Sequence, residues 1–99
     1  MSDYRQAWVQ DLRLCILKVL SNAPGNSANT SVLQRAVDVY GFRVTRPELN
    51  AELGELHRIG AVQNEQLDDD LCVAELTQRG QDHLDRRLTL PGVKPPSLS

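Results

Sequence analysis

Residues 45–62 read TRPELNAELGELHRIGAV and contain the start, the apolar stripe and the end of one helix. Thr45 can cap the first turn, and Pro47 fits that turn because no N–H partner is needed there. Glu48 lies three residues after Thr45, as a capping box requires. Leucines then recur at helical spacing until Gly60, where a left-handed C-terminal cap is expected. The stretch therefore predicts an amphipathic helix that ends at Gly60.

Two helices are expected before this one. Over residues 4–20 the apolar side chains recur at three- and four-residue intervals without Gly or Pro, which predicts an amphipathic helix. Residues 21–29 include Pro and Gly and are expected to form a loop. A second, short helix is expected to begin at a cap on Thr30 or Ser31 and to continue to Gly41.

After Gly60 the apolar period changes from 3.6 to 2. This change predicts two strands, residues 61–65 and 71–76, joined by a polar, acidic turn as an antiparallel hairpin. Thr77 is expected to cap a last helix that continues to about Leu88. The fold class that follows is mainly α with a small β-hairpin.

The chain is expected to form one domain followed by a short tail. Its 99 residues, of which 40% are apolar and 24% are charged, suit a single globular unit. We expect residues 1–88 to form this domain and the Pro-rich residues 89–99 to form an extended or disordered tail. No stretch approaches the roughly 20 apolar residues of a membrane span, and no signal peptide is recognisable at the start. We therefore expect a cytoplasmic protein without a membrane partner.

Charge is distributed unevenly behind a net value of −2. Residues 1–46 contain six Lys or Arg and three Asp or Glu, whereas residues 47–76 contain one Arg and eight acidic side chains. The last block, residues 77–99, is basic again. A nucleic acid would therefore have to contact the basic ends of the chain and not its acidic middle.

The order of elements, α-α-α-β-β-α, resembles the winged helix-turn-helix of small bacterial regulators of the arsenic-repressor-like and MarR-like families. The segments Leu56-His57-Arg58-Ile59-Gly60-Ala61-Val62 and Leu76-Thr77-Gln78-Arg79-Gly80 carry this resemblance. The short chain, its basic start and its Pro-Gly-Val-Lys-Pro-Pro-Ser ending are also similar to uncharacterised winged-helix proteins of Mu-like phages and prophages.

The resemblance implies that the third helix lies in the major groove of double-stranded DNA. By position it implies contacts from Thr45, Arg46 and Asn50, with Arg35 and Arg43 close to the flanking backbone.

Acidic residues oppose this expectation. Glu52 and Glu55 are expected on the exposed face of the same helix, and Asp68, Asp69 and Asp70 at the hairpin tip, where they would repel phosphates. Two functions therefore stay open. One is a phage-derived transcription or accessory factor that binds DNA, and the other is an interaction module whose acidic surface docks a basic host or phage protein.

Leu14 and Leu17 fall on the polar side of the first helix and form a narrow apolar strip. A small core is not expected to bury both this strip and the main apolar face of the helix. We therefore expect a homodimer that pairs the first helices through Leu14 and Leu17, joined by Leu88 and Leu90 near the last helix.

The four possible soft metal ligands are Cys15, His57, Cys72 and His83, and none are paired at the spacing of a zinc clip. Both cysteines follow the apolar pattern of their elements and are expected to be buried, reduced thiols. Neither histidine lies in a known catalytic motif. We expect no metal, no cofactor and no enzymatic activity.

Overall fold

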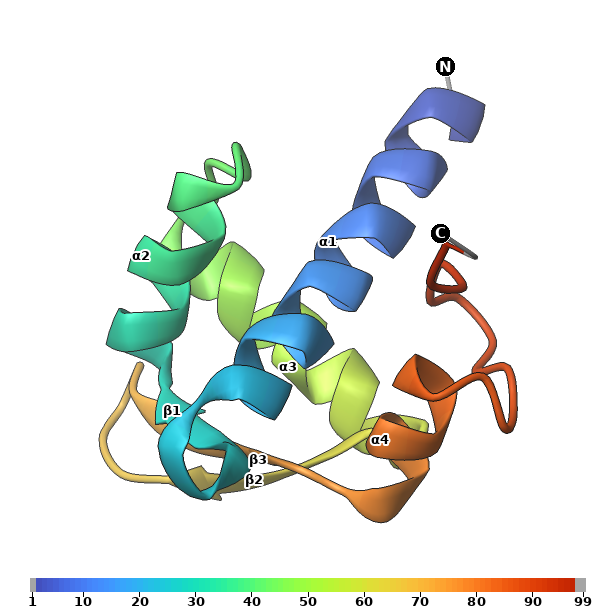
Figure 1. Ribbon diagram of the computed structural model, residues 1–99. Helices are drawn as coiled ribbons and strands as arrows, with labels where there is room; N and C mark the ends of the chain where they lie inside the picture. Colours follow the sequence, from blue (N-terminus) through green and yellow to red (C-terminus); the bar gives the residue numbers. More distant parts are fainter. Residues whose placement is uncertain (1, 98–99) are drawn as a thin grey trace.

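A computed structural model describes residues 2–97 and contains four α-helices and a three-stranded antiparallel sheet (Figure 1). The mainly helical winged fold expected from the sequence is confirmed. The elements, in chain order, are α1 (Ser2–Asn22), a 3-10 turn (Pro24–Asn26), β1 (Ser27–Asn29), α2 (Thr30–Val39), α3 (Arg46–Arg58), β2 (Val62–Gln66), β3 (Cys72–Leu76) and α4 (Gln78–Leu84).

The sheet contains one strand that the sequence did not indicate. β2 and β3 form the expected hairpin, with Val62 opposite Leu76 and Gln66 opposite Cys72. β1 pairs with the other edge of β3, so the strand order is β1-β3-β2. Its three residues were expected to be loop, because so short a strand is defined by its distant partner and not by its own composition.

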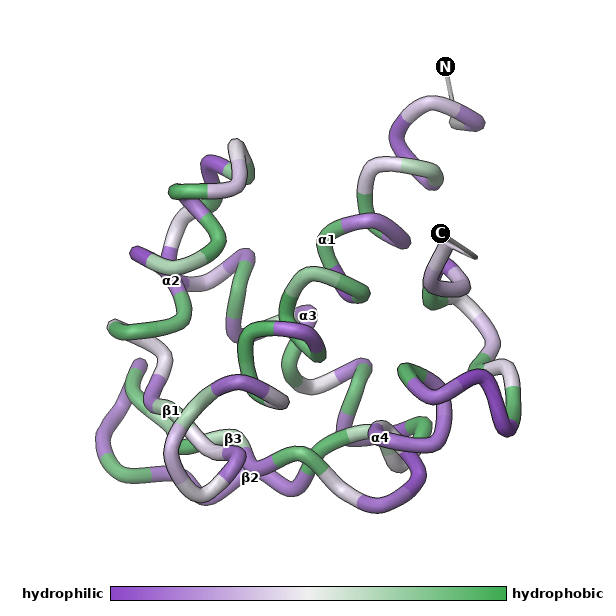
Figure 2. The backbone as a smooth tube through the Cα atoms, in the orientation of Figure 1, coloured by the Kyte–Doolittle hydropathy of each residue, from purple (hydrophilic) through white to green (hydrophobic). Residues whose placement is uncertain are grey.

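Helix α1 crosses the middle of the molecule, with α2 on one side and α4 with the C-terminal segment on the other, and α3 passes behind α1 in this view (Figure 1). Leu12, Ile16 and Leu20 are buried, as the main apolar face requires. Figure 2 shows hydrophobic stretches where the helices face one another, whereas the loop between β2 and β3 is largely hydrophilic. The hydrophobic core therefore surrounds α1 and extends onto the sheet.

The expectation of an exposed leucine strip on α1 is wrong. Leu14 is 5% exposed and Leu17 is fully buried within the same chain. Leu90 is buried too, and Leu88 is half-buried and packs on the same core. A helix at the centre of a small domain is covered on more than one side, so these leucines are not available as the predicted dimer interface.

Residues 89–97 cover the side of α1 that carries Leu14 and Leu17, although the sequence predicted that they extend away from the domain. Leu90 and Val93 join the core. The backbone N–H of Lys94 donates to the carbonyl of Gln10 at 3.2 Å, and Arg13 Nη1 donates to the carbonyl of Gly92 at 3.0 Å. Met1, Leu98 and Ser99, which belonged to the expected domain and tail, lie outside the described residues.

His83 fixes the start of this segment. The ring is buried, its Nδ1 accepts from the N–H of Leu90 at 3.0 Å, and its Nε2 lies 2.9 Å from the carbonyl of Lys94. Because Nδ1 is an acceptor, the proton of the neutral ring belongs on Nε2, from which it donates to that carbonyl. Both ring nitrogens of His83 therefore hold the C-terminal segment against α4.

Two helix ends differ from expectation. Asn29, and not Thr30 or Ser31, caps α2, because its side chain accepts from the N–H of Val32 at 2.9 Å. The last helix ends at Leu84 instead of about Leu88, and Arg86 adopts a left-handed φ of 66°. The caps at Thr45 and Thr77 are as expected. Of the helices described, none combines the length and apolar character that crossing a membrane requires.

Candidate nucleic-acid interface

The start of α3 is fixed by the predicted capping box. Thr45 Oγ1 accepts from the N–H of Glu48 at 3.2 Å, and Glu48 Oε1 accepts from the N–H of Thr45 at 2.8 Å. The hydrogen bond from the Thr45 backbone holds the pKa of Glu48 below its usual value. The Thr45 side chain therefore caps α3, and it is also exposed at the N-terminus of the helix.

Arg46 links three elements. Its Nε donates to Gln34 Oε1 of α2 at 3.1 Å, and its Nη1 lies 3.7 Å from the carboxylate of Asp70 at the hairpin tip. Gln34 in turn donates to the carbonyl of Val44 at 3.0 Å. The Arg46 side chain keeps 29% of its surface exposed, so a phosphate would have to compete with Asp70 for it.

The Asn50 side chain makes hydrogen bonds within the protein and is not free to contact DNA bases. Its Nδ2 donates to the carbonyl of Asp70 at 2.8 Å. Its Oδ1 lies 3.1 Å from the hydroxyl of the buried Thr30. That hydroxyl also accepts from the N–H of Cys72 at 3.0 Å, so α2, α3 and the hairpin meet at one point. The sequence could not reveal this role, because the partners are at least 20 residues away.

Arg35 and Arg43 are the predicted DNA contacts that stay available. Both are exposed, and among residues 2–97 no ion pair or hydrogen bond engages the Arg35 side chain. Arg43 is 91% exposed and lies 3.9 Å from Asp38, a distance at which an exposed pair contributes little. The two side chains border a shallow hollow of about 680 Å³ that reaches Thr45. We call these two residues the arginine edge.

Part of the exposed face of α3 has small side chains. Pro47, Ala51 and Gly54 follow one another along it, and a Cβ added at Gly54 would meet no atom within 4 Å. Glycine and alanine leave room for another surface to approach the helix backbone closely. This face therefore offers an open approach beside the arginine edge.

The acids of α3 are mostly paired, contrary to the expectation that they oppose a phosphate. Glu52 accepts from Arg13 of α1 at 2.7 Å, with 20% of its side chain exposed. Glu55 is bound by Arg58 at 2.5 Å. This contact lowers the pKa of Glu55 and raises that of Arg58. Apart from Glu48 of the capping box and Asp38 beside Arg43, the negative charge near the helix start therefore lies on the hairpin.

The hairpin tip is acidic and exposed at Asp68, Asp69 and Asp70. Leu67 beside it is 55% exposed. Because the carbonyl of Asp70 is bound by Asn50, the tip is held next to the start of α3. A polyanion bound at α3 would therefore meet repulsion from this side.

The four possible soft metal ligands named from the sequence are not brought together in one site. Within residues 2–97 no three His, Cys, Asp or Glu side chains come together in a group that could hold a metal ion. Cys72 is buried, whereas Cys15 is only half-buried, and burial raises the pKa of its thiol. His57 is exposed on α3.

Comparison with known proteins gives relatives in sequence and in structure, although no protein-family model matches the chain. It is 37% identical to an uncharacterised protein of Haemophilus influenzae over 77 residues, which cover 78% of this chain and 74% of that protein. It is 38% identical over 87 residues to uncharacterised protein gp26 of Escherichia phage Mu, and the match covers 88% of both chains.

Among solved structures, H. salinarum RosR superposes with a TM-score of 0.65 at 25% identity, covering 77% of this chain and 67% of RosR. Sco3205, a MarR family transcriptional regulator from Streptomyces coelicolor solved in complex with DNA, superposes with a TM-score of 0.63. That match is 24% identical, covers 83% of this chain and 52% of Sco3205, and shows the shared fold. The chain belongs to the family of small winged-helix proteins that includes gp26 of Escherichia phage Mu.

Proposed function

We propose that this protein binds double-stranded DNA through the start of α3 and the arginine edge, as a phage-derived transcription or accessory factor of the bacterial cytoplasm. The observation that carries the proposal is the position of Arg35 and Arg43, two exposed cations beside the first turn of α3. The positive end of the helix dipole also favours an anion here, although the N–H groups of Thr45 and Glu48 are already used by the capping box.

The DNA complex of the MarR family regulator Sco3205, which has the same fold, supports this proposal by analogy. In helix-turn-helix proteins the second helix of the motif enters the major groove, and here that helix is α3. Its small side chains at Ala51 and Gly54 suit close approach to a duplex. They offer few hydrogen bonds to base edges, so we expect binding that depends mainly on phosphate contacts.

The test is a salt titration of binding to a labelled duplex, measured by fluorescence anisotropy. Each phosphate contact contributes about 0.9 to the slope of log affinity against log salt concentration. Arg35→Ala and Arg43→Ala should each lower the affinity for every duplex and reduce the slope by about one. Arg87→Ala is the matched control, because Arg87 is exposed on the segment after α4. Absence of binding by the unmodified protein at low salt would contradict the proposal.

Replacing Asp68, Asp69 and Asp70 together by Asn tests whether the hairpin tip repels the phosphates of bound DNA. The backbone carbonyl that Asn50 binds is kept in this variant, so the hairpin should stay in place. Removal of three negative charges beside α3 should then strengthen binding to every duplex. Unchanged affinity would show that the hairpin tip lies away from the nucleic acid.

A second candidate function is docking of a basic host or phage protein on the hairpin tip. The observation that favours it is the exposed Leu67 next to the three aspartates, since interfaces combine an apolar anchor with complementary charge. In this case the triple Asn variant would lose the partner instead of gaining affinity for DNA.

A further inference from the structure

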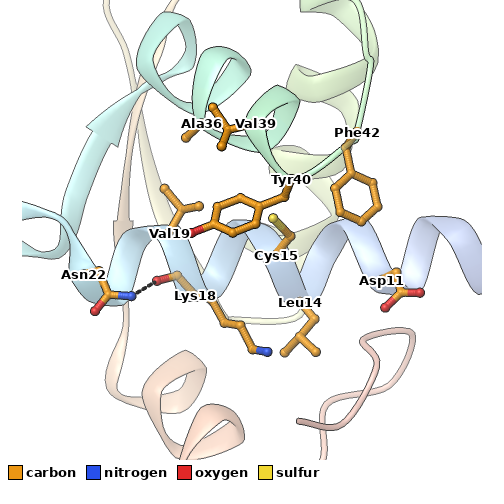
Figure 3. Close-up of a pocket in the computed structure, with 10 residues that line it drawn as sticks. All are labelled: Asp11, Leu14, Cys15, Lys18, Val19, Asn22, Ala36, Val39, Tyr40 and Phe42. Atoms are coloured by element: carbon orange, nitrogen blue, oxygen red, sulfur yellow. Dashed lines mark hydrogen bonds between the residues drawn. The ribbon is translucent and has the colours of Figure 1, made fainter. Parts of the chain in front are cut away.

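Val39 of α2 borders two hollows of the surface. Figure 3 shows it on the wall of a groove of about 630 Å³ between α1 and α2, and it also borders the hollow of the arginine edge. It is 81% exposed, the largest exposed fraction among the large apolar side chains of residues 2–97. The groove has one acidic and one basic side chain, Asp11 and Lys18, and therefore favours neither sign of charge. The hollow of the arginine edge differs, because it combines Val39 with two arginines.

This hollow fits an acidic segment that carries an apolar anchor. Its lining comes from α2 and the loop before α3, and Val39 and Val44 supply its apolar part. Arg35 and Arg43 outnumber the one acid of the lining, Asp38, so the net charge of the hollow is +1. The guanidinium of arginine matches the geometry of a carboxylate as well as that of a phosphate. Two carboxylates beside one apolar side chain would therefore satisfy both parts of this surface.

The hairpin tip of the same protein has this composition. Leu67 is 55% exposed and is followed by the three exposed aspartates. Within residues 2–97 neither Asp68 nor Asp69 takes part in an ion pair, whereas the Asp70 carboxylate lies 3.7 Å from Arg46. The tip therefore presents two unpaired carboxylates beside one apolar side chain, which matches the two arginines and the valines of the hollow.

The tip does not fill the hollow of its own chain. Asn50 Nδ2 holds the carbonyl of Asp70 at 2.8 Å, which fixes the tip beside α3. Among the described residues, those that line the hollow include none from the hairpin. Both surfaces are therefore open on one molecule. An exposed apolar side chain that fits a hollow elsewhere on the same protein favours a head-to-tail contact between copies, which can repeat from copy to copy.

We propose that the hairpin tip of one copy docks in the hollow of the arginine edge on a second copy. Asp68 and Asp69 then face the two arginines, and Leu67 covers Val39. The tip takes the place of the phosphates in the proposed function, so a docked copy and a duplex exclude each other. This exclusion rests on the proposed function, whereas the docking itself does not. The contact is small and its ion pairs are exposed, so we expect a weak association that added salt weakens further.

The test is sedimentation at low salt without DNA, so its outcome is independent of the proposed function. The average mass of the unmodified protein should rise above that of the monomer as the concentration approaches about 300 µM. The triple Asn variant of the tip, and Arg35→Ala combined with Arg43→Ala, should each raise the dissociation constant about tenfold or more, because exposed ion pairs are lost. Glu75→Gln, Asp82→Asn and Asp85→Asn together remove as many negative charges away from the tip and should associate as the unmodified protein does.

The decisive measurement mixes the two variants. The triple Asn variant keeps its arginine edge and the double Ala variant keeps its acidic tip. An equimolar mixture should therefore form a one-to-one complex that neither variant forms with itself, and this complex also shows that both are folded. Adding Leu67→Ala to the double Ala variant should weaken the complex. A monomeric mass of the unmodified protein at about 300 µM, or no complex in the mixture, would overturn the proposal.

A competition experiment tests the exclusion of DNA. An excess of the double Ala variant, whose tip is intact, should displace a labelled duplex from the unmodified protein. The same variant with the triple Asn change added should not displace it. A mixture that associates while no duplex binds would contradict the proposed function alone. A bound duplex that the intact tip does not displace would contradict the shared surface and therefore the proposal.

Discussion

Leu90→Ala tests whether the C-terminal segment belongs to the core. Leu90 is 1% exposed, and its N–H is held by His83 Nδ1 at 3.0 Å, so truncation leaves a cavity that the backbone does not easily close. Truncating a buried leucine of this kind costs about 2–5 kcal/mol of unfolding free energy. For a domain of this size each kcal/mol lowers the Tm by about 4–8 °C, so we expect a drop of about 10 °C or more.

The assay is urea unfolding followed by circular dichroism, with Leu67→Ala as the matched control. Leu67 is 55% exposed on the hairpin, and its truncation should change the unfolding free energy by less than about 0.5 kcal/mol. An equally small effect of Leu90→Ala would refute the inclusion of residues 89–97 in the domain. In that case the segment would be the free tail expected from composition.

Three further outcomes are expected. Gly80→Ala should cost about 1–3 kcal/mol in the same unfolding assay, because the new Cβ would meet the carbonyl oxygen of Ala61 and the side chain of Leu76. Asn50→Leu should cost a similar amount and speed hydrogen exchange at residues 67–71, since the Asp70 carbonyl loses its donor. Glu48→Gln should flatten the acid limb of a stability–pH profile. The folded pKa of Glu48 is depressed, so its contribution is full above about pH 4.5 and is lost as the pH falls through the folded value. Wild-type-like values for any of these would contradict the contact named.

Local features were predictable because they depend on neighbours in sequence. The capping box of Thr45 and Glu48 and the left-handed Gly60, with a φ of 85°, both follow from residues within one helix end. The strand period after Gly60 predicted the hairpin for the same reason. The capping box joins residues three positions apart, and the hairpin pairs two strands that follow one another in the chain.

Features that depend on distant partners were missed. Leu14 and Leu17 follow a polar pattern on α1, yet Leu90 and Val93 arrive more than 70 residues later to cover that side. Asn50 matches the position of a base-contacting residue, but its amide is used by Thr30 and Asp70. Periodicity indicates how many faces of a helix are apolar, and it does not indicate which segments will cover them.

DNA binding at the start of α3 can be tested by amide chemical-shift mapping on a ¹⁵N-labelled sample to which a short duplex is added at low salt. The largest changes are expected on residues 34–36 and 43–51, which include the arginine edge and the first half of α3. Arg35→Ala combined with Arg43→Ala should remove most of these changes while leaving the free spectrum folded. Changes confined to residues 67–71, or no change at any amide, would contradict DNA binding at this surface.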